Sequence, residues 1–252
     1  MLIDTHCHIH EPYDLSIEET LANAHRAGVH QLVCVGTSED SSLQAIEFSH
    51  THPEAFAAIG VHPHETDRGY GKIKELADAH SDIIAIGEIG LDYFYSHSPK
   101  EVQLEALAAQ IEVALAHNVP IIFHVREAFD DFWPIFDTYP GIRGVLHSFT
   151  DSRENLDKAL DRGLYIGLNG ISTFTKDEAQ KEVFDAVPVD RILFETDAPF
   201  LTPVPHRGKV NEPAYVRIVA EYHAARRGIS LEEIAEISSQ NARALFSLPV
   251  QS

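Results

Sequence analysis

The chain has 252 residues, with 19 Lys and Arg against 39 Asp and Glu, so its formal charge at pH 7 is −20 with His neutral. A hydrophobic share of 44% excludes a disordered or collagen-like chain, and no apolar run reaches the ~18 residues that a membrane helix needs. The acidic charge argues against a protein that binds nucleic acid along a broad basic face, but not against an enzyme that holds one phosphate in a small pocket charged by metal ions.

The first residues and the cysteines indicate the cellular compartment. The first residues lack the basic region and the apolar run of a signal peptide. Two cysteines, Cys7 and Cys34, are too few for a disulfide framework, and both are expected in the core. We therefore expect a cytoplasmic protein that does not associate with membranes.

Eight short runs of apolar and β-branched residues predict strands. They lie at residues 2–5, 31–36, 56–61, 83–87, 120–123, 144–146, 164–168 and 192–194. The segments between them predict helices, of which the clearest lie at residues 16–28, from 98 through 115, 152–163, 213–227 and 231–246. Ser16 as a cap and Gly28 as a terminator mark the first helix, and Pro99 opens the second.

The alternation of strand and helix predicts an α/β protein with a parallel sheet. Eight such units favour a closed (β/α)8 TIM barrel, and its length suits a single domain over residues 1–252. An open, doubly wound sheet is the structural alternative, because the number of strands alone does not exclude it.

Polar residues of metal-ligand type stand at the carboxyl ends of the predicted strands. They are His6, His8, Glu88, His124, His147 and Asp197. Active sites of barrel enzymes are built at this end of the strands, and a closed barrel brings all of these ends onto one ring. One such residue alone is more often a structural group or a helix cap. Six at the same end of separate units predict a metal site, and four imidazoles with two carboxylates suit two divalent ions.

The segment His6-Cys7-His8 has a geometry of its own. Residues i and i+2 of an extended segment point to the same side, so both imidazoles can face one ion. Cys7 then points away from that ion, and we expect it to be a small buried hydrophobic residue rather than a ligand.

These residues lie in motifs that resemble the TatD-type metal-dependent deoxyribonucleases of the amidohydrolase superfamily. The matching stretches are IDTHCH (3–8), GVHPH (60–64), GEIGLDY (87–93), FHVREA (123–128), HSF (147–149), ETDAPFL (195–201) and NEP (211–213). The motif His-x-His is weak by itself, but the ordered series is highly specific and spans residues 3 to 213. One departure is Val210, where the family usually has Arg; this puts details of substrate contact in doubt, but not metal binding.

The resemblance implies a (β/α)8 barrel with two divalent metal ions, which the sequence does not identify among Zn, Mg and Mn. It implies that His6 and His8 hold the first ion, that His124 and His147 hold the second, and that Glu88 bridges the two. Asp197 would complete the first site and accept a proton from the attacking water. Two close cations lower the pKa of a shared water and stabilise charge on the scissile group.

Four further residues are candidates for contact with substrate. His62 follows the third strand, and we favour phosphate contact or leaving-group protonation over a structural hydrogen bond. Arg126, two residues past His124, is predicted either to bind phosphate oxygens or to form an exposed ion pair with Glu127 or Asp130. Asn211 and Glu212 are predicted at the substrate rim or beside the ligands, with a helix cap as the alternative.

Three groups have roles that the sequence leaves open. Glu195 is predicted to support the site or to add a metal contact, and the role of His64 is open. Aromatic residues follow Glu88 at positions 93 to 95. They are predicted either to stack on a nucleobase or to pack as a hydrophobic lid on the barrel rim, and we slightly favour the lid.

The predicted function is hydrolysis of phosphodiester bonds in DNA, as a 3′ to 5′ exonuclease on single strands. The expected partners are DNA ends or a small phosphodiester substrate, and we expect a monomer. The alternative is a small-molecule amidohydrolase or lactonase with the same metal centre, because fold and metals support both chemistries. A lysine at the end of the fourth strand would have favoured that alternative, and Glu88 stands there instead.

Overall fold

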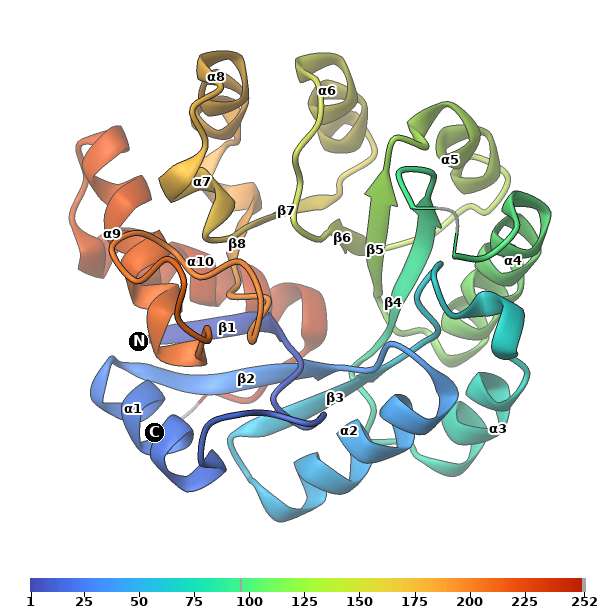
Figure 1. The fold of residues 1–252 in the computed structure, drawn as a ribbon. Helices are drawn as coiled ribbons and strands as arrows, with labels where there is room; N and C mark the ends of the chain where they lie inside the picture. The colour runs from blue at the N-terminus through green and yellow to red at the C-terminus, as the bar shows by residue number, and fades with distance from the viewer. Residues whose placement is uncertain (96, 251–252) are drawn as a thin grey trace. The chain divides into compact units, whose positions relative to one another are not determined.

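The computed structural model describes residues 1–95 and 97–250. Eight parallel strands follow one another in the sheet in chain order, β1 to β8, and alternate with helices (Figure 1). β1 also lies against β8, where the Thr5 hydroxyl donates to the carbonyl of Phe194 at 3.1 Å. This contact distinguishes a closed barrel from an open, doubly wound sheet, and the prediction of a (β/α)8 TIM barrel is confirmed.

The strands are β1 (Leu2–Cys7), β2 (Val29–Val35), β3 (Ala55–Ile59), β4 (Ala85–Asp92), β5 (Ile121–Arg126), β6 (Gly144–Leu146), β7 (Tyr165–Leu168) and β8 (Ile192–Phe194). The helices are α1 (Ile17–Arg26), α2 (Glu39–Thr51), α3 (Lys72–Ala79), α4 (Lys100–His117), α5 (Phe129–Phe136), α6 (Arg153–Asp161), α7 (Ile171–Phe174), α8 (Glu178–Ala186), α9 (Val216–Arg227) and α10 (Leu231–Phe246). Short 3-10 turns are η1 (Thr66–Arg68), η2 (Val189–Arg191) and η3 (Pro213–Tyr215).

The chain forms two compact units. Unit 1 comprises residues 1–34 and 148–252, and unit 2 comprises residues 35–147. The prediction of one domain over the whole chain stays a prediction.

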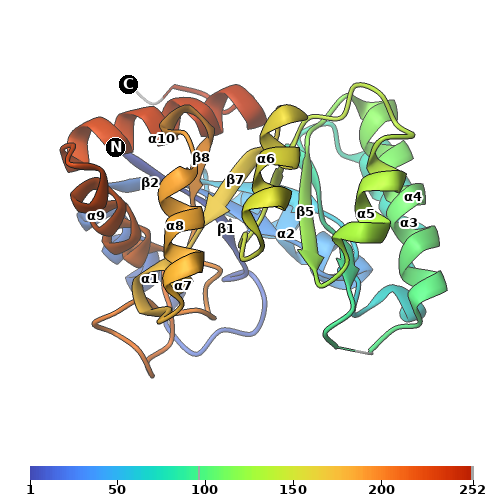
Figure 2. The ribbon, with the colours of Figure 1, turned by 90° about the horizontal axis from the view of Figure 1, so that it is seen from above.

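In unit 1, α9 and α10 pack against β1 and β8 (Figure 2). The helices begin where the sequence places caps: the hydroxyl of Ser16 accepts from the backbone N–H of Glu19, and the hydroxyl of Ser230 accepts from Glu233 at 3.0 Å. Each such cap satisfies an N–H group that the helix itself leaves without a partner.

In unit 2, α2, α4 and α5 pack against β3, β4 and β5 (Figure 1). Phe123 on β5 and Phe132 on α5 are fully buried, with ring centroids 5.1 Å apart, so aromatic packing joins this strand to its helix. β4 and β5 are parallel neighbours with a register shift between Ile86 and Ile89, and Gly90 faces His124 across the pair. A Cβ atom on residue 90 would lie 1.7 Å from the carbonyl oxygen of His124, so only glycine permits this approach.

Three strands extend beyond their predicted ends. β1, β4 and β5 were predicted to end at residues 5, 87 and 123, but they continue to Cys7, Asp92 and Arg126. Glu88 and His124 therefore lie inside strands rather than after them. No helix within the two described stretches, 1–95 and 97–250, is long and apolar enough to cross a membrane.

Candidate functional site

Three predicted ligands of unit 1 meet in what we call the His6 cluster, which consists of His6, His8 and Asp197. Nε2 of His6 lies 3.2 Å from Nε2 of His8. Oδ1 of Asp197 lies 3.7 Å and 3.3 Å from these two nitrogens. Donor atoms ~2.0–2.1 Å from a tetrahedral ion are separated by about 3.3 Å, so this set fits a divalent ion.

The backbone of residues 196–198 runs beside β1 and positions this cluster. The N–H of Asp197 donates to the carbonyl of His6 at 2.9 Å, and the N–H of His8 donates to the carbonyl of Ala198 at 2.7 Å. Asp197 itself has a left-handed φ of 59°, which is unusual for a residue other than glycine. The alternation predicted for His6-Cys7-His8 is confirmed, because Cys7 is fully buried and its thiol points to the carbonyl of Val33.

Asp4 supports the same cluster and was missed in the sequence. Its carboxylate accepts from the N–H of Thr196 at 2.8 Å and from the hydroxyl of Thr196 at 2.6 Å, which fixes the residue beside Asp197. Complete burial raises the pKa of Asp4 to about 8, against the lowering effect of the hydrogen bonds from Thr196. The signal in the sequence was its spacing, since residues 4, 6 and 8 of an extended segment share one face.

Glu195 occupies a buried position in unit 1. Its Oε1 accepts from the N–H of Ser148 at 2.7 Å and from Nδ2 of Asn169 at 3.3 Å. The carboxylate thereby links the end of β8 to the segments that follow β6 and β7. Its predicted role as support for the site or as an extra metal contact stays a prediction.

The predicted ligands of unit 2 gather around one carboxylate oxygen. We call this group the Glu88 cluster, and it consists of Glu88, His62, His124 and His147. Oε1 of Glu88 lies 2.7 Å from Nδ1 of His124 and 3.6 Å from Nε2 of both His62 and His147. Three of these, Glu88, His62 and His124, are close enough to hold one ion. The sequence assigned His62 to substrate, and the structure adds it to the groups of metal-ligand type.

Asp92 lies behind this cluster and is the second residue that the sequence missed. Its Oδ2 lies 2.9 Å from Nε2 of His124 and 2.9 Å from Nε2 of His64, and its side chain is almost fully buried. A carboxylate in this place accepts a hydrogen bond from Nε2, so that Nδ1 of His124 would offer its lone pair to an ion bound beside Glu88. His64, whose role is open, therefore shares this carboxylate oxygen with His124.

The pKa values of these groups follow from burial and from their partners. Burial alone would lower the pKa of His124, but hydrogen bonds with Asp92 and Glu88 raise it above its ordinary value. Burial, and then the charge of His124, lower the pKa of His62 well below its ordinary value. Burial alone would raise the pKa of Asp92, but hydrogen bonds with both histidines hold it far below its usual range.

Arg126 lies at the end of β5, exposed, beside the aromatic loop that follows β4. Its guanidinium carbon lies 3.9 Å from the ring centroid of Phe94 and 5.1 Å from that of Tyr95. The alternative to phosphate contact, an ion pair with Glu127 or Asp130, is not among the described interactions of Arg126. Phosphate contact by Arg126 stays a prediction.

Asn211 and Glu212 lie in unit 1, beside the loop that carries Asp197. Asn211 has no exposed surface, and its Nδ2 donates to the carbonyls of Thr196 and Phe200. Oε2 of Glu212 accepts from Nδ2 of Asn23 at 2.8 Å. Their predicted contact with substrate stays a prediction, and the structure gives Asn211 a definite second task, which is to hold the loop around Asp197.

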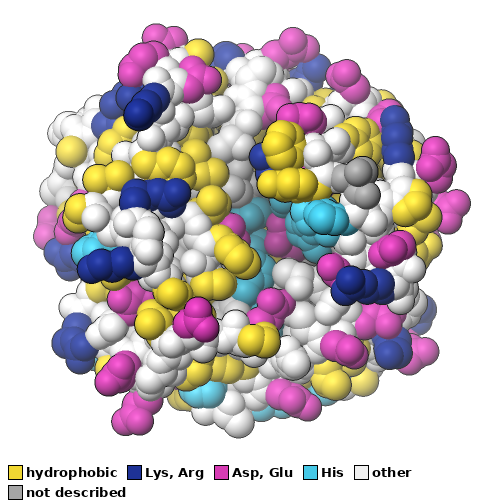
Figure 3. Space-filling view, in the orientation of Figure 1, with side chains coloured by type: hydrophobic (Ala, Val, Ile, Leu, Met, Phe, Trp, Pro, Cys, Tyr) yellow, Lys and Arg dark blue, Asp and Glu magenta, His cyan; other side chains and the backbone are white. Residues whose placement is uncertain are grey.

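Histidine side chains reach the surface beside acidic and hydrophobic ones in Figure 3. Both clusters combine imidazoles with carboxylates, the donor set that zinc and similar divalent ions accept. Ions held there would leave coordination positions for water, because each cluster offers only a few donors.

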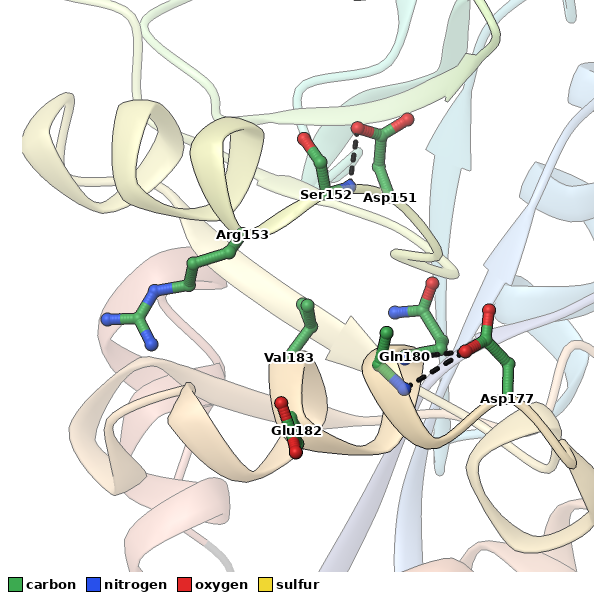
Figure 4. A pocket seen from close by; sticks show the side chains of 8 residues that line it. Asp151, Ser152, Arg153, Asp177, Gln180, Glu182 and Val183 are labelled. Carbon is green, nitrogen blue, oxygen red and sulfur yellow. Dashed lines mark hydrogen bonds between the residues drawn. The ribbon is translucent and has the colours of Figure 1, made fainter.

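A separate pocket of about 460 Å³ lies in unit 1, between the starts of α6 and α8 (Figure 4). It is lined by Asp151, Arg153 and Asp177 among others, and Oδ1 of Asp177 accepts from the N–H groups of Ala179 and Gln180. Asp177 is therefore a helix cap. This pocket contains none of the predicted site residues.

Known proteins are similar to this chain over nearly its whole length. The family model described as "TatD related DNase" matches residues 3–247. An "Uncharacterized metal-dependent hydrolase YabD" of Bacillus subtilis is 40% identical over 98% of this chain and 100% of its own length. A "3'-5' ssDNA/RNA exonuclease TatD" of Salmonella typhimurium is 34% identical over 92% of this chain and 93% of its own length. The crystal structure of YJJV, a TatD homolog from Escherichia coli, superposes with a TM-score of 0.91 at 27% identity and covers 98% of both chains.

Proposed function

Because the chain belongs to the family of TatD-related DNases, a family of metal-dependent hydrolases, we propose that it hydrolyses phosphodiester bonds of DNA. We propose further that it removes nucleotides from the 3′ end of single strands. The observation that carries this proposal is the full-length similarity to a relative named as a 3′–5′ exonuclease on single-stranded DNA and RNA, at 34% identity. The clustered imidazoles and carboxylates of both units supply the chemistry that such a reaction needs.

The metal ligands of the proposal are divided between the two clusters. His6, His8 and Asp197 would hold one ion, His124 and His147 would hold a second, and Glu88 would be a ligand common to both. The ions would be zinc, magnesium or manganese. When bound, they activate a water molecule and stabilise the negative charge that grows on the phosphate.

The remaining steps belong to side chains of this chain. Asp197, which keeps part of its side chain exposed, accepts the proton of the attacking water, a task for which a carboxylate within hydrogen-bond reach suffices. His62 lies beside Glu88 and contacts a phosphate oxygen or the leaving group. Arg126 offers a guanidinium to a neighbouring phosphate.

The alternative is an amidohydrolase or lactonase that acts on a small molecule with the same centre. β4 (Ala85–Asp92) contains two carboxylates and no lysine, so the strand lacks the group that would favour this alternative. Fold similarity does not separate the two functions, because one barrel supports both.

The test is a paired assay of the protein and its Glu88→Ala variant, each reconstituted with zinc, manganese or magnesium. Single-stranded DNA labelled at the 5′ end, duplex DNA and RNA are incubated beside a panel of amides and lactones. We expect a ladder of shortened, still labelled single strands from the native protein and none from the variant. Glu154→Ala, on an exposed helical position, is the matched control and should retain activity.

Cleavage of no nucleic acid with any of the three metals, together with turnover of an amide or a lactone, would contradict the proposal. The substrate would then be a small molecule, and the family and the barrel would stand. Activity of Glu88→Ala equal to that of the native protein would contradict the assignment of Glu88.

A further inference from the structure

Two large aromatic side chains lie exposed in unit 2, in the loop after β4. Phe94 keeps 49% of its surface exposed and Tyr95 keeps 43%. Their rings meet edge to face, with centroids 4.7 Å apart. We call Phe94 and Tyr95 the aromatic pair. Exposed apolar side chains that lie together mark candidate binding surfaces, and this one is connected to the Glu88 cluster.

The aromatic pair is held by a buried anchor. The backbone N–H groups of Phe94 and Tyr95 both donate to Oδ1 of Asp92, at 3.0 and 3.1 Å. The N–H of Asp92 in turn donates to Oε1 of Gln103 at 2.9 Å, which ties the loop to α4. The rings are therefore presented on a fixed backbone, and binding a flat ligand would cost little ordering of the loop.

A continuous run of rings leads from the aromatic pair to the Glu88 cluster. Tyr95 meets His64 edge to face at 5.4 Å, His64 meets His62 at 4.4 Å, and His62 meets His124 at 4.3 Å. His62 and His124 both lie beside Oε1 of Glu88. A ligand whose phosphate lies at Glu88 would thus have its next large group near the aromatic pair.

The charge beside the aromatic pair is positive. The guanidinium of Arg126 lies over the ring of Phe94, where the ring face attracts it. An exposed aromatic surface and a cation therefore lie side by side. Proteins that bind single-stranded nucleic acid without regard to sequence combine these two features.

We propose that Phe94 and Tyr95, with Arg126 beside them, form a stacking site for a nucleobase of the single strand whose phosphate lies at the Glu88 cluster. This inference rests on the proposed function. Stacking is tolerant of sequence because every base has a ring face, so the site takes any of the four bases. It favours single strands, because the bases of a duplex already stack on one another.

The test compares two octamers of deoxythymidine as substrates of the metal-loaded protein. One has all its bases, and the other has tetrahydrofuran in place of the sugar and base at its two 3′-terminal positions. We expect the native protein to prefer the complete octamer, mainly through a lower KM. Phe94→Ala and Tyr95→Ala should each reduce that preference by about 5- to 150-fold, the range for one stacked base, and should lower the rate on the abasic octamer much less. Phe94→Leu, which keeps an apolar side chain without a ring, should fall between.

A binding measurement makes the test independent of turnover. A phosphorothioate octamer, which resists cleavage, carries the fluorescent base 2-aminopurine at its 3′ end. We expect the native protein to quench its fluorescence, and Phe94→Ala to quench it less at saturating protein. Tyr139→Ala is the control, because this aromatic residue lies after α5, and should behave as the native protein in both assays.

Three results would overturn the proposal, and they distinguish failure of the stacking site from failure of the proposed function. An unchanged preference for the complete octamer in both alanine variants would overturn the stacking site and leave the nuclease standing. An equal loss on both octamers would also overturn it, because the residues would then act on the metal centre rather than on a base. No cleavage of either octamer by the native protein with zinc, manganese or magnesium would contradict the proposed function and the stacking site with it.

Discussion

Asp92 and His124 lie 2.9 Å apart, between Oδ2 of the carboxylate and Nε2 of the imidazole, on the neighbouring strands β4 and β5. The other oxygen of Asp92 accepts from the backbone of Phe94 and Tyr95. One buried carboxylate thus serves the histidine of the Glu88 cluster with one oxygen and the aromatic pair with the other. The two tasks can be separated by mutation.

Asp92→Asn should impair metal binding and leave the aromatic pair in place. The N–H groups of Phe94 and Tyr95 require an acceptor, so the amide oxygen of the new side chain would face them and its NH₂ group would face His124. The NH₂ group can only donate, so Nε2 of His124 becomes an acceptor and its proton moves to Nδ1, the atom that faces Glu88. We expect metal affinity to fall by about 10- to 100-fold, measured by titration with cobalt or zinc.

Asp157→Asn is the control for this change, because Asp157 is exposed and pairs only with Arg153 among its described partners. Equal metal affinity of Asp92→Asn and the native protein would show that Asp92 does not determine which ring nitrogen of His124 carries the proton. Loss of the 2-aminopurine signal along with the metal would show that the two tasks are not separable.

Gly90→Ala should destabilise the protein strongly. The added Cβ would lie 1.7 Å from the carbonyl oxygen of His124, so β4 and β5 would have to separate at the point where both carry site residues. We expect a loss of about 3 kcal/mol or more, or failure to fold, measured by urea unfolding. Gly71→Ala is the control, since no atom lies within 4 Å of its added Cβ; equal stability of the two variants would contradict the close approach.

The barrel was predictable from the sequence because its strands are apolar and β-branched, and because eight of them recur at the spacing of strand-plus-helix units. β6 and β8 were predicted with the bounds that the structure shows. β4 and β5 were cut short, because hydrophobic periodicity takes the first polar residue as the end of a strand. In this barrel Glu88 and His124 lie on strand positions.

The same cause explains why Asp92 was missed. Once β4 was taken to end before Glu88, residue 92 belonged to a loop, where an aspartate is an ordinary turn residue. Residue 92 lies four positions after Glu88. If the strand had been predicted to continue, this spacing would have placed Asp92 and Glu88 on the same face. Asp4 was missed for a different reason, since its partner Thr196 is 192 residues away and no local pattern indicates that contact.

Thr196→Val should weaken the support of the His6 cluster. The hydroxyl of Thr196 donates to Oδ2 of Asp4 at 2.6 Å and accepts from the N–H of Ala198 at 3.1 Å. Valine has the same shape without the hydroxyl, so two buried polar groups lose a partner. We expect a loss of about 2 kcal/mol in the free energy of unfolding and weaker metal binding. Thr196→Ser keeps the hydroxyl and should lose less than half as much; equal losses would mean that packing rather than hydrogen bonding matters here.

His223 should make the stability of the protein depend on pH. It is fully buried on α9, where Nε2 lies 3.0 Å from the hydroxyl of Ser172 and Nδ1 lies 3.0 Å from the guanidinium of Arg227. Burial, and then the charge of Arg227, lower the pKa of His223 to about 3. The unfolded chain binds this proton at its ordinary pKa of about 6.5, so His223 contributes full stability above that pH and loses it as the pH falls toward 3.

His223→Gln removes the titrating group and keeps an amide that can donate to Ser172. Native and variant proteins should therefore differ most above pH 6.5, and the difference should shrink by about 1.4 kcal/mol for each pH unit below it. Urea unfolding of both proteins between pH 5 and pH 8, with EDTA present so that metal binding does not contribute, measures this difference. Acidic residues titrate alike in both proteins and cancel. Parallel curves would show that the folded protein also protonates His223 near its ordinary pKa.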